Sequence, residues 1–133
     1  METIEVDIAT GMELVTDLTD HVVQFCRDRG DGLVNIFVPH ATAGVAIMET
    51  GSGSETDLAN TIDRLLPPDA TYQHRHGSPG HGRDHVLPCF VGPSATLPVL
   101  AGRPLLGTWQ RVVMVDSNVD NRRRHVRLSF LSG

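Results

Sequence analysis

The spacing of apolar residues along the chain predicts seven strands and two helices. Apolar and polar residues alternate where a strand has one buried face, and apolar residues recur every three to four positions along one face of a helix. The predicted strands cover residues 3–10, 33–38, 45–48, 86–91, 95–100, 108–116 and 123–130. The predicted helices cover residues 17–29 and 54–66, before Gly30 and Pro67.

The order of these elements indicates the fold class. Two helices accompany some seven strands, and the last four strands follow one another without a helix between them. We therefore expect an α+β fold in which a single, mainly antiparallel or mixed sheet carries two main helices. The strand at 45–48 is expected to pair with the strand at 33–38. The length of 133 residues predicts one domain spanning 1–133.

The charge balance restricts the chemistry. A net charge of -5 argues against general nucleic-acid binding, which depends on neutralising phosphates with cations. Every cationic side chain among the 11 Lys and Arg residues is an arginine, so the chain can form no lysine Schiff base and has no lysine general base. Anions must therefore be bound by Arg, His or backbone N–H groups.

The cysteines and the N-terminal segment indicate the compartment. Cys26 falls in a helical pattern and Cys89 in an apolar run, and they form no C-x-x-C pair, so both are expected to be reduced and buried. The first residues have neither the basic start nor the apolar stretch of a signal peptide. No apolar run approaches the roughly 20 residues of a membrane span. We expect a cytoplasmic protein that does not bind membranes.

Four histidines in a polar loop form the strongest local signal. Residues 69–84 show no apolar periodicity, and a loop of about this length in a compact domain is usually functional or mobile. Imidazole suits Zn, Cu, Fe and Ni, and Asp84 could accept a hydrogen bond from a ligand ring. The alternative is a solvated loop that binds nothing. The four residues are His74, His76, His81 and His85.

Two further segments carry polar side chains at strand ends. His40 stands at the junction of two predicted strands and Glu49 at the end of the second, and the alternative for His40 is a simple turn residue. Thr108, Trp109 and Gln110 begin a later strand that ends at Asp116, although a lone Trp is often a core residue. The arginines at 122–124 could bind phosphate, or could lie in a solvated turn.

Taken in order along the chain, these segments resemble the YjbQ-like family, which is associated with secondary thiamine-phosphate synthase activity. The segment His40 to Gly44 looks like the family's His-Thr-Ser-Ala-Gly segment. His74, His85 and the Arg pair at 123–124 also match the family's pattern. The most specific match is the series Ser94, Leu97, Val99, Gly102, Gly107, Thr108, Trp109, Gln110 and Val112.

The resemblance implies an α+β fold, a homotrimer and a site near a subunit boundary. It implies a reaction that joins a hydroxymethylpyrimidine diphosphate to a thiazole phosphate and releases diphosphate. The implied metal ligands are His40, His74 and His85, and the candidate catalytic residues are His40, Glu49 and Asp116. The candidate residues for binding substrate or another anion are Thr42, Ser94, Thr108, Trp109, Gln110, Arg123 and Arg124.

The ligand types leave the reaction open. A site rich in histidine favours Zn²⁺ over Mg²⁺, because Mg²⁺ prefers carboxylates and water. Three histidines with an open position are typical of hydrolytic zinc enzymes rather than of diphosphate transferases. The expected partner is a small phosphorylated molecule or another anion. The alternatives to the synthase are a metal-dependent hydrolase of unknown substrate and a non-catalytic metal- or anion-binding protein.

Overall fold

The computed structural model describes residues 1–133. The strands are β1 (Glu2–Ala9), β2 (Val15–Asp17), β3 (Gly32–Phe37), β4 (Ala43–Met48), β5 (Ser94–Leu100), β6 (Arg103–Pro104), β7 (Arg111–Asp116) and β8 (Arg123–Ser132). The helices are α1 (Thr19–Cys26), α2 (Ser54–Leu65), α3 (His81–Asp84) and a short 3₁₀ helix, η1 (Leu87–Cys89). None of them is long and apolar enough to cross a membrane.

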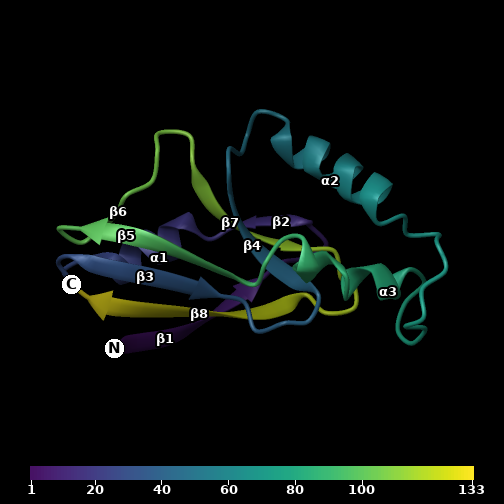
Figure 1. The fold of residues 1–133 in the computed structure, drawn as a ribbon, viewed down its shortest axis with the longest axis horizontal. Helices are drawn as coiled ribbons and strands as arrows, with labels where there is room; N and C mark the ends of the chain where they lie inside the picture. Colours follow the sequence, from purple (N-terminus) through teal and green to yellow (C-terminus); the bar gives the residue numbers. More distant parts are fainter.

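The strands form two antiparallel sheets. The five-stranded sheet has the order β1-β8-β3-β5-β6, and the three-stranded sheet has the order β2-β7-β4 (Figure 1). The α+β class is confirmed, but the strands do not share one sheet as expected. β4 pairs with β7 rather than with β3. The chain leaves β3 at Val38, whose N–H donates to Pro93 O, and Pro39 has no N–H with which to extend the ladder.

The three-stranded sheet is buried on both faces. Val112 and Met114 of β7 belong to a core cluster of 17 buried residues that also contains the inner faces of the five-stranded sheet and α1. Val113 and Val115, on the opposite face of β7, belong to a second cluster with Ile62 of α2. The molecule thus has three layers, and β7 is a rigid central strand from which loops can be positioned.

One predicted strand is absent from the structure, and another begins later than predicted. The run 86–91 is not a strand: it contains η1 and packs Leu87 into the second cluster, and a short apolar run cannot be told from a helical turn by its pattern. Cys89 is consequently exposed, whereas Cys26 is buried as expected. The strand predicted at 108–116 begins only at Arg111.

Candidate functional site

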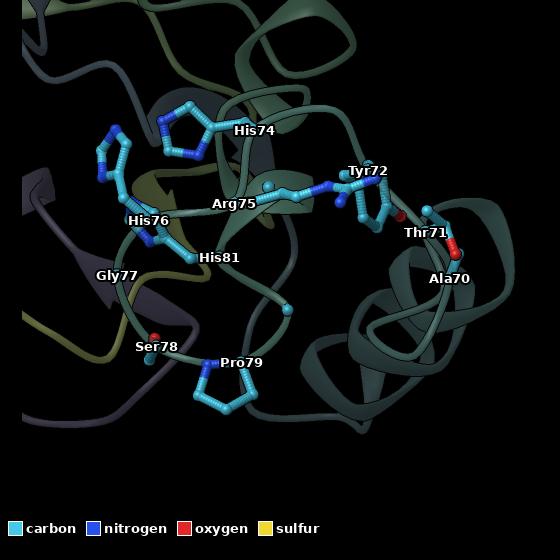
Figure 2. A pocket seen from close by; sticks show the side chains of 12 residues that line it. Ala70, Thr71, Tyr72, His74, Arg75, His76, Gly77, Ser78, Pro79 and His81 are labelled. Atoms are coloured by element: carbon cyan, nitrogen blue, oxygen red, sulfur yellow. The ribbon is translucent and has the colours of Figure 1, made fainter.

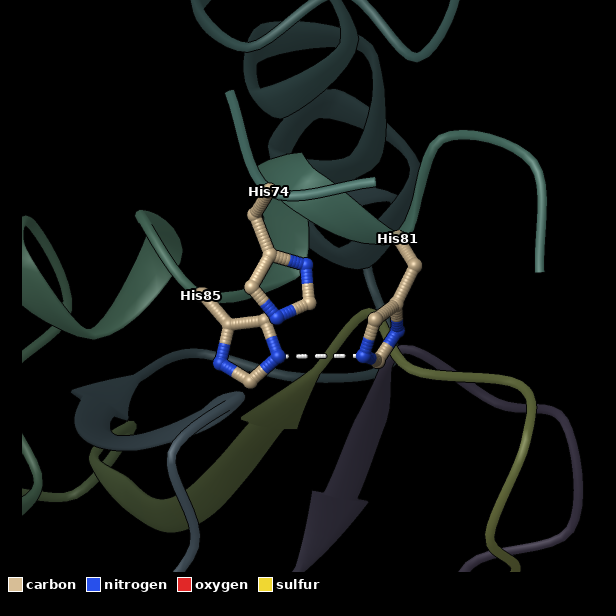
Figure 3. Close-up of side chains that lie close together, drawn as sticks. All are labelled: His74, His81 and His85. Carbon is tan, nitrogen blue, oxygen red and sulfur yellow. Dashed lines mark hydrogen bonds between the residues drawn. The ribbon is translucent and has the colours of Figure 1, made fainter. Parts of the chain in front are cut away.

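Three histidines meet at α3. His81 begins this short helix and His85 follows its last residue, so a single helical turn places both side chains on one face. Their Nε2 atoms lie 3.0 Å apart, and His74 approaches them from the preceding loop (Figure 3). One ring nitrogen of each residue lies within 4.8 Å of those of the other two. We call His74, His81 and His85 the three-His cluster.

Two glycines allow the loop that carries His74 to pack closely on α3. A Cβ atom at Gly82 would lie 2.5 Å from Tyr72 Cβ and 2.8 Å from His74 O. A Cβ atom at Gly77, where φ is +89°, would lie 2.7 Å from His81 Cδ2. A larger residue at either position would displace the segment that carries a histidine of the cluster.

Desolvation favours the neutral form of His74 in the three-His cluster. Desolvation, and then the neighbouring His76, His85 and His81, hold the pKa of His74 below its usual value. The Nδ1 atoms of His74 and His81 are buried and make no aligned hydrogen bond. Neutral imidazole is the form that binds metal ions, and at the centre of the cluster the Nε2 atoms of His81 and His85 hydrogen-bond to each other.

The spacing of the three-His cluster fits a divalent metal ion. Zn²⁺ binds imidazole nitrogen at about 2.0–2.1 Å with tetrahedral geometry, so two of its ligand nitrogens lie about 3.3–3.4 Å apart. The Nε2 atoms of His81 and His85, 3.0 Å apart, are close to that separation. Three nitrogen ligands would leave a fourth position open, and they suit Zn²⁺ rather than Mg²⁺, which prefers oxygen.

Two carboxylates face the other ring nitrogen of His81. Asp84 Oδ2 lies 3.2 Å and Asp120 Oδ2 3.5 Å from His81 Nδ1. Asp84 is only 4% exposed, and its Oδ1 accepts a hydrogen bond of 2.6 Å from Ser117 Oγ. Asp120 accepts hydrogen bonds from the backbone N–H and the hydroxyl of Ser78, which lower its pKa.

An open cavity of about 400 Å³ adjoins the three-His cluster. Figure 2 shows His74, His76 and His81 along one side of it, with Arg75 extended toward Tyr72. His76 packs on His74 with ring centroids 3.8 Å apart but lies outside the group of ligand atoms. The cavity therefore combines imidazole nitrogens with the cation of Arg75, an arrangement suited to an anionic molecule.

His40 is not brought into the three-His cluster, so the structure does not assemble the expected ligand set of His40, His74 and His85. His40 lies where the chain crosses between the sheets, and its Nε2 accepts a hydrogen bond of 2.8 Å from the backbone N–H of His125. Burial, followed by the positive charge of Arg124, lowers the pKa of His40. Its accepting nitrogen is thus already used within the protein.

His81 is the cluster member that the expected ligand set omitted. Its signal in the sequence was the i, i+4 spacing to His85, which the intervening Gly82 and the preceding Pro79 made doubtful as a helix. α3 is only 4 residues long, yet one turn is sufficient to bring the two rings together.

Asp116 and Arg124 form a buried network rather than an open anion site. Arg124 Nε donates to Asp116 Oδ2 at 2.5 Å, and Arg124 Nη2 donates to Thr42 Oγ1 at 3.2 Å. Thr42 Oγ1 lies 3.3 Å from Asp116 Oδ1, which also accepts from the N–H of Asn118. Thr42, Asp116 and Arg124 are each 4–5% exposed. In this Arg124 network, Arg124 is thus buried and neutralised by Asp116 rather than open to a substrate phosphate.

The remaining candidate residues lie elsewhere. Glu49 is exposed and lies just beyond the end of β4 that is farther from His40. The length per residue of an extended strand puts the two residues about 20 Å apart. Trp109 is 72% exposed in a turn, where the Gln110 side chain accepts the N–H of Gly107. Figure 1 places this β6–β7 loop and α3 well apart along the long axis. Thr108, Ser94 and Arg123 are also exposed, outside the cavity.

A second group of potential ligands lies on the outer face of the five-stranded sheet. Glu5, Asp7 and His125 are all exposed, with their ligand atoms within 4.8 Å of one another. His125 Nδ1 lies 2.6 Å from Asp7 Oδ1, and Arg127 donates to Glu5 at 2.9 Å. These side chains already pair with one another on a solvated surface, in contrast to the three-His cluster.

Known proteins are similar to this chain over most or all of its length. Residues 2–133 match the family described as UPF0047 protein YjbQ-like. The UPF0047 protein Rv2556c of Mycobacterium tuberculosis is 60% identical over 133 residues, which cover 100% of both chains. The UPF0047 protein MJ1081 of Methanocaldococcus jannaschii is 32% identical across 84% of this chain and 80% of its own.

Solved structures share the fold. The hypothetical protein APE1520 of Aeropyrum pernix has a TM-score of 0.89 at 32% identity, with 100% of both chains covered. The conserved hypothetical protein TT1486 of Thermus thermophilus has a TM-score of 0.83 at 28% identity, covering 96% of this chain and 99% of its own. With sequence and fold in agreement from end to end, the chain belongs to the UPF0047, or YjbQ-like, family.

Proposed function

We propose that this protein is a zinc-dependent enzyme that acts on a small molecule carrying a phosphate or a similar anionic group. The observation that carries the proposal is the three-His cluster, whose ring nitrogens lie close together and two of whose members, His74 and His81, line a cavity. A zinc ion with three imidazole ligands and an open position supplies a Lewis acid that polarises a substrate oxygen and acidifies water.

The residues around the cavity have separate roles in this proposal. His74, His81 and His85 hold the metal ion. Arg75 lines the cavity and binds the anionic group, and the exposed ring of His76 can donate a further hydrogen bond to it. Arg75 and His76 would thereby hold the phosphate beside the three-His cluster, with its reacting P–O bond toward the metal ligands.

Hydrolysis is the reaction class that this ligand set favours. Thiamine-phosphate synthase activity is the second candidate, supported by the family resemblance and by cationic side chains that could bind a diphosphate leaving group. Of the two arginines expected to do so, Arg124 is buried in an ion pair and Arg123 is exposed outside the cavity, so Arg75 would have to take this role. A weak or secondary synthase activity is compatible with that arrangement.

The proposal extends to assembly and compartment. The resemblance supports a homotrimer, which would give a mass in solution three times the chain mass of 14.5 kDa. The two cysteines are free, one buried and one exposed, as is usual in a reducing cytoplasm.

Elemental analysis of the protein purified without a His tag tests the metal site. We expect about one zinc per chain in the wild type and in His21→Ala, which removes an exposed imidazole of α1. His81→Ala should contain none, whereas His125→Ala should retain the ion. Full zinc in His81→Ala together with its loss in His125→Ala would move the site to the outer sheet face.

Activity assays of the zinc-loaded protein then separate the reactions. Release of phosphate from small phosphate esters, lost in both His81→Ala and Arg75→Ala, would support the hydrolase. Formation of thiamine phosphate, or rescue of a thiamine auxotroph on high expression, would support the synthase. Tight zinc binding without either activity would favour the non-catalytic metal-binding alternative.

A further inference from the structure

We propose that Asp84, itself held by Ser117, is the positioning residue of the three-His cluster. It fixes the His81 ring with Nδ1–H toward the carboxylate and the Nε2 lone pair toward His74 and His85. This inference rests on the proposed zinc site and names the side chains that preorganise it.

The contacts of Asp84 leave His81 as the group that its second oxygen faces. Asp84 Oδ1 is occupied by the Ser117 hydroxyl at 2.6 Å, whereas Oδ2 lies 3.2 Å from His81 Nδ1. His81 Nδ1 is buried and has no aligned hydrogen-bond partner. Rotation of the ring toward Asp84 would align Nδ1–H with the carboxylate. A carboxylate on one nitrogen of a ligand imidazole fixes the tautomer and raises the basicity of the other.

The order of these contacts excludes a nucleophilic role for Ser117. In a Ser–His–Asp triad the imidazole stands between the hydroxyl and the carboxylate, so that it can take the hydroxyl proton. Here the carboxylate of Asp84 stands between Ser117 and His81, and the hydroxyl donates to the carboxylate. Ser117 therefore orients Asp84 and is not activated.

The local charges also favour a cation at the three-His cluster. Asp84 has a single cationic neighbour, Arg83, whose Nε lies 3.8 Å from Asp84 Oδ1 and which pairs more closely with Asp63 at 2.6 Å. A buried carboxylate without a close cation is unfavourable. Asp84 and Asp120 together bring two negative charges to His81, and a divalent ion held by the three-His cluster would balance them.

The central strand β7 makes this positioning rigid. Ser117 directly follows Asp116, the last residue of β7, and every residue of this strand after Arg111 is buried. From the same connection to β8, Asp120 holds the loop at Ser78 through two hydrogen bonds. The β7–β8 connection is thus hydrogen-bonded to residues on both sides of His81 in the sequence, Ser78 before it and Asp84 after it. A site supported in this way by a rigid element keeps its geometry.

The test compares four variants of the full-length protein. Asp84→Asn keeps the shape and removes the charge, Ser117→Ala removes the hydroxyl, and Ser117→Thr retains it. Asp63→Asn is the matched control, because Asp63 pairs with the same Arg83, whereas Asp84 is the residue that faces His81. Zinc affinity is measured by competition with a chelator. The tautomer of His81 is read by ¹⁵N NMR of the metal-free protein.

We expect Asp84→Asn to lower zinc affinity about 10–100-fold and to reduce the population of His81 with its proton on Nδ1. Ser117→Ala should lower the affinity by about tenfold or less, while Ser117→Thr and Asp63→Asn should resemble the wild type. An unchanged tautomer and unchanged affinity in Asp84→Asn would overturn the positioning role. A wild type that binds no zinc would instead refute the zinc site, and the metal-free tautomers would still decide the role of Asp84.

Discussion

The three-His cluster and the Arg124 network are both polar groups in a largely apolar molecule, but they differ in how well they are satisfied. In the Arg124 network, the carboxylate of Asp116 accepts from an arginine and from a backbone N–H, and Arg124 also reaches Thr42. In the three-His cluster, the Nδ1 atoms of His74 and His81 are buried and make no aligned hydrogen bond. A buried polar group without a hydrogen-bond partner destabilises the folded protein. We therefore interpret the Arg124 network as structural and the three-His cluster as a site for a ligand.

The comparison also explains why residue type alone misleads. Arginine beside a histidine suggests an anion site, yet Arg124 is 4% exposed and neutralised by Asp116. Histidines in a glycine-rich loop suggest a solvated segment, yet His81 is buried. Burial and partners, rather than chemical identity, decide which group is available to a substrate.

The largest effect should come from breaking the Arg124 network. Arg124→Met would leave the buried carboxylate of Asp116 without its cation, and we expect a loss of about 3–5 kcal/mol in the free energy of unfolding. Arg127→Met breaks an exposed pair with Glu5 and should cost about 1 kcal/mol or less. Urea denaturation measures both. Equal losses in the two variants would contradict the structural role assigned to the network.

The next effect should come from filling the three-His cluster. Zinc at 100 times its dissociation constant should raise the free energy of unfolding by about 2.7 kcal/mol, because it binds the folded state. His85→Ala should lose this increment, whereas His40→Ala should keep it, since His40 lies outside the cluster. Thermal or urea unfolding with and without zinc checks the prediction. Loss of the increment in His40→Ala would restore His40 as a ligand.

Much of the fold could be predicted because alternation and helical spacing report which faces are buried. The strands at β1, β3, β5 and β8 and the helix α2 were confirmed nearly to their ends. Pairing partners could not be predicted in the same way, since a strand pattern identifies a buried face but not the neighbouring strand. The residues of β2 and β6, which span 3 and 2 positions, are too few to show a period.

The candidate site was predictable where its members are close in sequence. His74, His81 and His85 lie within one loop and one helical turn, so their spacing contains the signal. The Arg124 network was not predictable, because Thr42 and Arg124 are 82 residues apart and only the fold brings them together. From the sequence, residues so far apart look free to bind a substrate, but in the structure they pair with each other.

A smaller effect should follow from loosening the loop that carries His74. Gly82→Ala places a methyl group against Tyr72 Cβ and His74 O, which should cost about 1–3 kcal/mol and weaken zinc binding as His74 moves away. Gly92→Ala is the matched control, because a Cβ atom there would meet nothing within 4 Å. Unfolding and zinc competition are measured on both. Normal zinc affinity in Gly82→Ala would show that His74 does not need this close approach.

The smallest effect should appear in the pH dependence of stability, measured after the metal has been removed. The unfolded chain protonates His40 as the pH falls through its ordinary value of 6.5, whereas burial and Arg124 delay protonation in the folded protein. The unfolded state then binds more protons in this window, so this contribution is present above pH 6.5 and is lost as the pH falls through the lower pKa of the folded state.

His40→Gln isolates this contribution. Glutamine can still accept the N–H of His125 but does not titrate, so the urea midpoint should fall less steeply on acidification than in the wild type. His21→Gln, on an exposed face of α1, should leave the slope unchanged. Identical slopes in all three proteins would mean that His40 accepts a proton as readily when folded as when unfolded.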